Sequence, residues 1–127
     1  MQDLSRRAII SRLLITSMSH VTQSSLIIRT FGPGLDDIMI SCAIIIGHHE
    51  GVPMSASDIA GYVNLPRSTV IRKLQKMALF GVISFSKDGA RTPVIVKKLD
   101  NDDYVDRVVN AIHQASDKLR SLSKMDG

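Results

Sequence analysis

The segment covering residues 57–81 constrains the fold most strongly, because two helical patterns occur in it with only a short break between them. Ile59 and Val63 lie four residues apart, the spacing of one face of a short helix. Asn64 tolerates the left-handed conformation that a tight turn needs. Pro66 suits the first position of a new helix, because its missing N–H costs nothing there. The segment therefore predicts a helix-turn-helix.

The short first helix has two candidate N-cap residues, Ser55 and Ser57. Either hydroxyl can accept a backbone N–H of the first turn. With Ser57 as the cap, the helix covers residues 58–63, and the charge of Asp58 stabilises its start. The preceding residues 51–54 contain a proline between turn-forming residues, which predicts an extended linker that can add a short strand to a small sheet.

The second helix combines an apolar face with basic and hydroxyl side chains elsewhere. Val70, Leu74 and Met77 share the face that we expect to be buried. The polar side chains that remain are Arg67, Ser68, Thr69, Arg72, Lys73 and Lys76. Residues 55–98 hold eight basic side chains against two carboxylates, a local net charge of +6 in a chain whose total is +4. Such an excess is typical of a phosphate-binding surface, although a solvated basic face has the same composition.

A β-hairpin is predicted directly after this helix. Residues 82–86 alternate like a strand, residues 93–96 resume as a second strand, and the intervening Asp88-Gly89 is a turn signal. In this position a hairpin would form a wing. Its basic Lys87 and Arg91 could reach phosphates or an adjacent minor groove.

Long helices are predicted at both ends of the chain. Residues 3–29 have helical apolar spacing, and a second helix, with two aspartates in its first turn, is expected over residues 35–47. In residues 101–124 apolar side chains recur at spacings of 3, 4, 3, 4 and 3. This heptad seam consists of Val105, Val108, Ile112, Ala115, Leu119 and Leu122. It suits packing against the same helix of a second protomer or against the N-terminal helix.

Other classes of protein find little support. The chain of 127 residues, 44% hydrophobic, has enough apolar content for one domain without metals or disulfides, and its 4% aromatic content disfavours a base-stacking surface. Cys42 lies in an apolar run, which favours core packing over redox chemistry.

His48-His49-Glu50 lacks the spacing of three or four residues that metal ligands on a helix need. No phosphate loop or nucleophile elbow is present, so we expect neither an enzyme nor a cofactor.

The expected location is the cytoplasm. Arginines interrupt the apolar pattern of the N-terminus, which lacks the uninterrupted apolar core of a signal peptide. The longest apolar run, residues 38–47, falls far short of the roughly 20 residues of a membrane span. We therefore expect no membrane partner.

With these elements in order, the chain resembles the MarR-like winged helix-turn-helix transcription regulators over essentially its whole length. The matching residues are Ile59-Ala60, Val63, Leu65, Arg67-Ser68-Thr69-Val70, Leu74, Gly81-Val82-Ile83 and Val94-Ile95-Val96. Residues 65–70 are also similar to the DNA-binding domain of IclR-type regulators, whose large effector domain this chain has no room for. The sequence departs from the MarR-like pattern at Asn64, where the turn glycine is usual, and in the wing at Ala90-Arg91-Thr92.

The resemblance implies a mainly α, α+β fold: a single winged helix domain over residues 1–127. It would comprise an N-terminal dimerisation helix within residues 1–31, a winged helix-turn-helix over residues 35–98 and a C-terminal dimerisation helix over residues 101–124. It also implies a homodimer on near-palindromic double-stranded DNA and, as in many members, a small-molecule effector.

The expected function is a sequence-specific DNA-binding transcriptional regulator, a homodimeric repressor. The expected DNA contacts are Arg67, Ser68, Thr69, Arg72, Lys73, Lys76, Lys87 and Arg91, and the heptad seam is the expected dimerisation surface. Two alternatives remain open at this point. One is a winged-helix assembly module without DNA contact, and the other is a DNA-binding protein of replication or plasmid maintenance.

Overall fold

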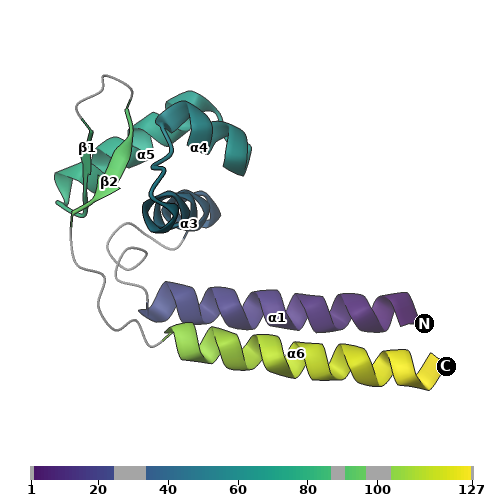
Figure 1. The fold of residues 1–127 in the computed structure, drawn as a ribbon. Helices are drawn as coiled ribbons and strands as arrows, with labels where there is room; N and C mark the ends of the chain where they lie inside the picture. The colour runs from purple at the N-terminus through teal and green to yellow at the C-terminus, as the bar shows by residue number, and fades with distance from the viewer. Residues whose placement is uncertain (1, 25–33, 87–90, 97–103, 127) are drawn as a thin grey trace. The chain divides into compact units, whose positions relative to one another are not determined.

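The computed structural model describes residues 2–24, 34–86, 91–96 and 104–126, and these residues are mainly helical with a small two-stranded antiparallel sheet (Figure 1). The helices and strands are α1 Gln2–Ser24, α3 Leu35–Glu50, α4 Ala56–Val63, α5 Arg67–Leu79, β1 Ile83–Phe85, β2 Pro93–Ile95 and α6 Tyr104–Asp126. The expected single domain comprises two compact units, one of residues 1–25 with 101–127 and one of residues 26–100.

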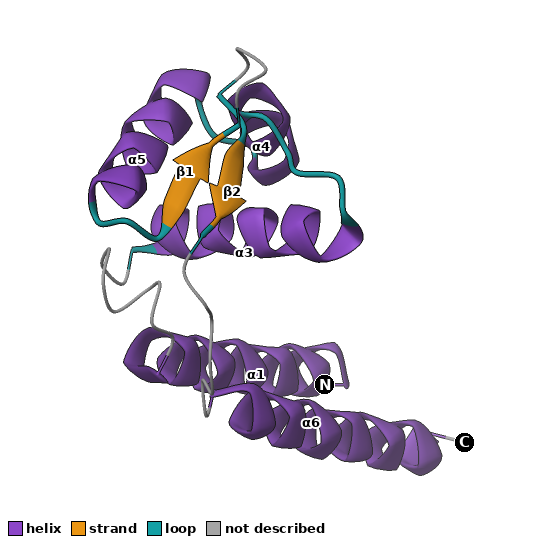
Figure 2. Ribbon diagram, turned by 60° about the vertical axis from the view of Figure 1, so that its left-hand side comes forward, coloured by secondary structure: helices purple, strands orange, loops and turns teal. Residues whose placement is uncertain are grey.

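The first unit is a pair of long helices, as the periodicity at both ends of the chain predicts. Helices α1 and α6 lie side by side along their length, and the N-terminus of α1 is at the same end as the C-terminus of α6 (Figures 1 and 2). The pair is therefore antiparallel. Among the side chains of α6 that the structure describes, Ala115 is the most buried apolar one, with 8% of its surface exposed. The part of the predicted N-terminal helix beyond Ser24 lies outside the described residues.

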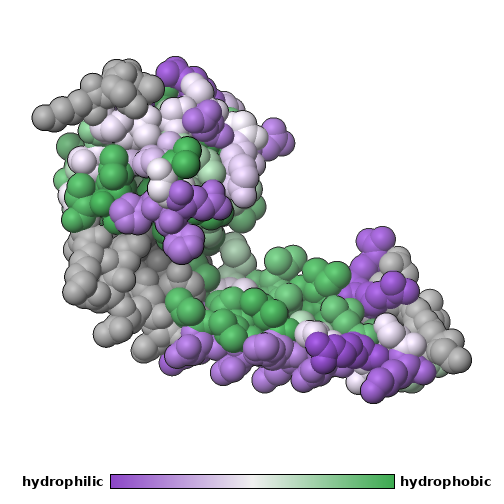
Figure 3. Space-filling view, in the orientation of Figure 1, coloured by the Kyte–Doolittle hydropathy of each residue, from purple (hydrophilic) through white to green (hydrophobic). Residues whose placement is uncertain are grey.

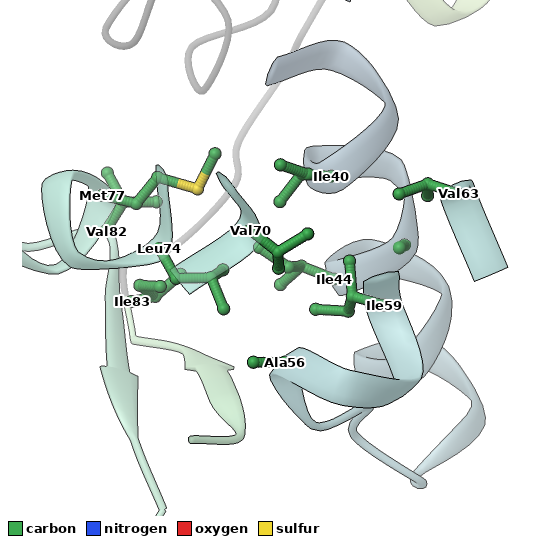
Figure 4. Packing of buried hydrophobic residues seen from close by; sticks show 11 residues of the cluster. Ile40, Ile44, Ala56, Ile59, Val63, Val70, Leu74, Met77, Val82 and Ile83 are labelled. Carbon is green, nitrogen blue, oxygen red and sulfur yellow. The ribbon is translucent and has the colours of Figure 1, made fainter. Parts of the chain in front are cut away.

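The second unit packs three helices and the sheet around one apolar core (Figures 2 and 4). Each of the three helices and β1 contributes side chains, and the segment between α5 and β1 contributes one more. The buried residues are Ile40, Ala43 and Ile44 of α3, Ala56, Ile59 and Val63 of α4, Val70, Leu74 and Met77 of α5, and Val82 and Ile83. The predicted buried face of α5 is thus confirmed.

The predicted hairpin strands are present, each slightly shorter than expected. β1 and β2 pair antiparallel, with Ile83 opposite Ile95 and Phe85 opposite Pro93. Backbone hydrogen bonds extend the ladder on both sides, from Ser86 N to Thr92 O at 2.9 Å and from Val96 N to Val82 O at 3.0 Å. The predicted turn at Asp88-Gly89 and the expected DNA contact Lys87 lie outside the described residues.

Helix α3 ends later than predicted, at Glu50 instead of residue 47. Gly51 supplies the left-handed conformation that closes the helix, with φ 74°, and its N–H bonds to the carbonyls of the last turn. Gly47 is a packing position: a Cβ there would lie 3.1 Å from both Val52 O and Met54 N. Residues 51–54 are not a strand. The link to the hairpin is instead a hydrogen bond from Ala56 N to Arg91 O at 2.8 Å.

The cap of α4 is Ser55, so the start predicted from Ser57 is wrong by two residues. The Ser55 hydroxyl accepts from Asp58 N at 3.1 Å, and the Asp58 carboxylate accepts from Ser55 N at 3.1 Å. This reciprocal pair satisfies two backbone donors of the first turn, whereas Ser57 as the cap would place its three-residue partner at Ala60, which has no carboxylate.

We predict that Ser55→Ala lowers the free energy of unfolding by about 1 kcal/mol, because it removes the cap acceptor. The matched change Ser57→Ala should lower it by about 0.5 kcal/mol or less, because Ser57 takes no part in the cap and loses only an exposed hydrogen bond from the Arg67 side chain. Urea denaturation followed by circular dichroism measures both. Equal losses for the two variants would contradict the assignment of the cap.

Candidate functional site

The connection between α4 and α5 fixes the orientation of α5. Asn64 adopts the left-handed conformation, with φ 59° and ψ 50°, as its place in the turn predicts. Its N–H and that of Leu65 both donate to Ala60 O, which closes α4. Pro66 is the N-cap of α5 and Arg67 its first residue, one position later than predicted. The Pro66 carbonyl accepts from Thr69 N and Val70 N at 3.1 Å, so the chain enters the helix directly after the turn.

The outward face of α5 carries the candidate site. Because successive residues on a helix are about 100° apart, the face opposite the buried side chains carries Ser68, Arg72, Gln75, Lys76 and Leu79, and all five are exposed. Thr69 lies at the edge of this face and is half-buried. The residues of α5 include four bases and no carboxylate, so nothing within the helix neutralises its positive charge.

Two predicted DNA contacts of α5 have partners within the protein. The Arg67 Nε donates to Ser57 Oγ at 2.8 Å, which ties the start of α5 to α4. The Lys73 Nζ lies 3.1 Å from Asp37 Oδ1 and 3.2 Å from Asp37 Oδ2, which ties α5 to α3. The Lys73 side chain is 25% exposed and that of Asp37 only 9%. The Lys73 ammonium is therefore engaged in an internal ion pair, and its contact with a phosphate stays a prediction.

The hairpin adds one described basic side chain. Arg91 is exposed, two residues before β2 begins, and its carbonyl accepts a hydrogen bond from the N–H of Ala56, the first residue of α4. The structure thus brings the backbone of Arg91 to the N-terminus of α4. Arg72 and Lys76 lie on the outward face of α5 in the same compact unit.

Gln75 is a polar member of this face that is not among the residues predicted from the sequence. It is exposed between Arg72 and Lys76, and its amide can donate and accept hydrogen bonds. The helical periodicity that located its neighbours could have located it too, because it falls on the same side of the helix as Arg72.

Packing against α1 covers only part of the heptad seam of α6. Ala115 is buried, and Val108, Leu119 and Leu122 are half-buried, whereas Val105 and Ile112 keep 51% and 49% of their surface exposed. Packing of α6 against α1 leaves one side of the seam uncovered.

Cys42 is exposed on α3, so the prediction that it packs in the core is wrong. The apolar residues around it conceal which side of α3 faces the core. Partial burial of the thiol by its neighbours raises the pKa of Cys42.

Within the described residues, no three His, Cys, Asp or Glu side chains are grouped so that they could hold a metal ion. Over the same parts of the chain, none of the helices has the length and apolar character needed to cross a bilayer. The chain matches no family model, no curated protein and no solved structure.

We predict that Lys73→Ala and Asp37→Ala each lower the free energy of unfolding by about 1–3 kcal/mol, because each leaves the other charge without its partner in a partly buried place. The double variant should lose less than the sum of the two. Lys76→Ala, on the exposed face of the same helix, is the control and should change stability by less than about 0.5 kcal/mol. Chemical denaturation measures all four. Additive losses would show that the pair does not couple α3 to α5.

Proposed function

We propose that this protein is a winged helix-turn-helix regulator of the MarR-like kind, a homodimeric repressor that binds double-stranded DNA sequence-specifically. The observation that supports this most directly is the outward face of α5, where Ser68, Arg72 and Lys76 are exposed on a helix without carboxylates. Burial of Val70, Leu74 and Met77 holds that face in place.

The dimensions and the chemistry of α5 suit a major groove. Its 13 residues extend about 20 Å at 1.5 Å per residue, and a groove about 12 Å wide admits a helix. Arg72 lies in the second turn, where its guanidinium can bind O6 and N7 of a guanine bidentately. Ser68 and Thr69 in the first turn can donate to phosphates. In this proposal the β1–β2 hairpin is the wing, with Arg91 directed to the DNA backbone.

The internal pair between Lys73 and Asp37 narrows the set of DNA contacts. Lys73 would have to leave a partly buried carboxylate to reach a phosphate, which would cost about 1–3 kcal/mol. Arg72 and Lys76 have no such constraint, since both are exposed. We therefore assign the main contacts on α5 to these two side chains.

Duplex binding should depend steeply on salt. If two protomers neutralise about 8 phosphates, log affinity against log salt concentration should have a slope near −7. Arg72→Ala with Lys76→Ala removes four cations from a dimer and should bring the slope to about −3.5. Fluorescence anisotropy with a duplex selected from a random pool measures both values.

The control for this experiment removes the same charge elsewhere. Arg107→Ala with Lys124→Ala changes two exposed cations of α6 and should keep the wild-type slope. A flat salt response of the wild-type protein, or equal effects of the two double variants, would refute DNA binding through α5. The selected half-sites should be about one helical turn, roughly 34 Å, apart.

A homodimer is supported by an apolar surface that the α1–α6 pair leaves uncovered. At about 100° per residue, Val105, Val109 and Ile112 share one flank of α6, and Ile10 and Leu14 share a flank of α1. In an antiparallel pair these two flanks lie on the same side. All five residues are at least 43% exposed. Figure 3 shows apolar residues gathered along the pair, with hydrophilic residues along the edge.

We call this set of Ile10, Leu14, Val105, Val109 and Ile112 the apolar flank, and we propose that it packs against a second copy. Exposed apolar residues scattered singly are ordinary, but a contiguous row along two helices is typical of an interface. A second pair of helices on this flank would complete a four-helix arrangement.

We predict that Ile112→Asp makes the protein monomeric, because it places a carboxylate at the centre of the apolar flank. Asn110→Asp, on the exposed outer face of α6, should leave the dimer intact. Sedimentation velocity gives the mass of each variant, and circular dichroism verifies the helix content. A dimeric Ile112→Asp variant would exclude this flank as the interface.

A further inference from the structure

A groove runs between α1 and α6 on the side of the pair away from the apolar flank. Ile9 and Leu13 of α1 and Ala111 and Ala115 of α6 form its apolar floor, and Arg12 and Lys118 stand at its rims. Its volume is about 200 Å³. The small side chains of Ala111 and Ala115 create the depth of the groove, because larger residues at either position would fill it.

The helical positions of the lining residues place the groove on its own side of the pair. On α6, Gln114 and Lys118 are about 120–180° from Ile112 and Val109. On α1, Arg12 is about 160° from Ile10 and Leu14. In the antiparallel pair, the side of α1 that carries Arg12 and the side of α6 that carries Gln114 and Lys118 therefore face the same way, opposite to the apolar flank. The groove therefore stays open when a second copy covers the apolar flank.

The charge of the groove is positive and uncompensated. No carboxylate lines it, and within the described residues neither Arg12 nor Lys118 takes part in an ion pair or a side-chain hydrogen bond. Asp117, next to Lys118 in sequence, lies instead 3.8 Å from Arg120 on another face of α6. Thr16 and Gln114 add hydrogen-bonding groups to the lining.

We propose that this groove binds a small carboxylate with an unbranched apolar body. The apolar floor removes the body from water, and the two cations bracket the carboxylate, with the guanidinium of Arg12 able to bind it bidentately. A closed cavity of about 150 Å³ holds benzene, so this larger and open groove should accept about eight to ten non-hydrogen atoms. Binding here requires neither DNA contact nor the charges of α5.

The test is isothermal titration of the full chain with sodium octanoate, with octanamide as the uncharged ligand of the same shape. Octanoate should bind at least about tenfold more tightly than octanamide, because the neutral amide cannot form charge-assisted hydrogen bonds with Arg12 and Lys118. Arg12→Gln with Lys118→Gln should weaken octanoate binding at least about tenfold. Arg107→Gln with Lys124→Gln, equal in charge but outside the groove, should change it less than about twofold.

A second variant tests the apolar part of the site. Ala111→Leu should fill the groove and abolish octanoate binding while circular dichroism shows unchanged helix content. Equal binding of octanoate and octanamide, or octanoate binding by either groove variant with wild-type affinity, would overturn the proposal. Octanoate affinity should also stay the same as the protein concentration rises and dimers form. A weaker affinity at high protein concentration would overturn the proposal, because a second copy would then occupy the groove. The Arg72→Ala, Lys76→Ala variant should bind octanoate normally, which separates this test from that of DNA binding.

Discussion

Burial of one face of α5 against α3 and α4 determines what the rest of this chain can present to a partner. Val70, Leu74 and Met77 are almost completely buried, and each such side chain contributes about 1.5–3 kcal/mol to stability. The α4 cap contributes only about 1 kcal/mol. Burial of the three side chains therefore fixes the rotation of α5 about its axis, and with it the direction of the basic side chains. Any partner of Arg72 and Lys76 meets a rigid helix that packing has already oriented.

The same packing places one basic side chain of α5 against the protein and leaves others in water. Lys73 lies at the edge of the buried face, close enough to α3 for its ammonium to reach both oxygens of Asp37. Arg72 and Lys76 point away from the core and stay in water. A count of basic residues therefore overstates the charge that α5 offers outward. If α5 binds DNA as proposed, it neutralises phosphates with fewer cations than its sequence contains, which makes the salt dependence of each variant easier to interpret.

The features that the sequence predicted well are governed by short-range rules. The left-handed Asn64, the buried face of α5 and the two strands each follow from residues within a few positions of one another. The cap of α4 was uncertain because Ser55 and Ser57 both satisfy the rule for a cap, and only the reciprocal bond with Asp58 separates them. The ion pair of Lys73 joins residues 36 positions apart, and no local pattern indicates it. Cys42 was misplaced because apolar residues lie all around α3, so that periodicity does not reveal its exposed side.

The heptad seam shows how a pattern can be correct and still have two uses. Its spacing predicted packing against either the N-terminal helix or a second protomer, and α1 covers the part around Ala115. Including Val109, the apolar residues of the seam span an arc of about 140° around α6, wider than the narrow stripe that a single neighbouring helix covers. The uncovered remainder continues onto Ile10 and Leu14 of α1 instead of ending at the edge of α6. Packing against α1 and the proposed packing against a second copy are therefore compatible uses of one seam, and together they would leave the polar side of the pair open to the proposed ligand.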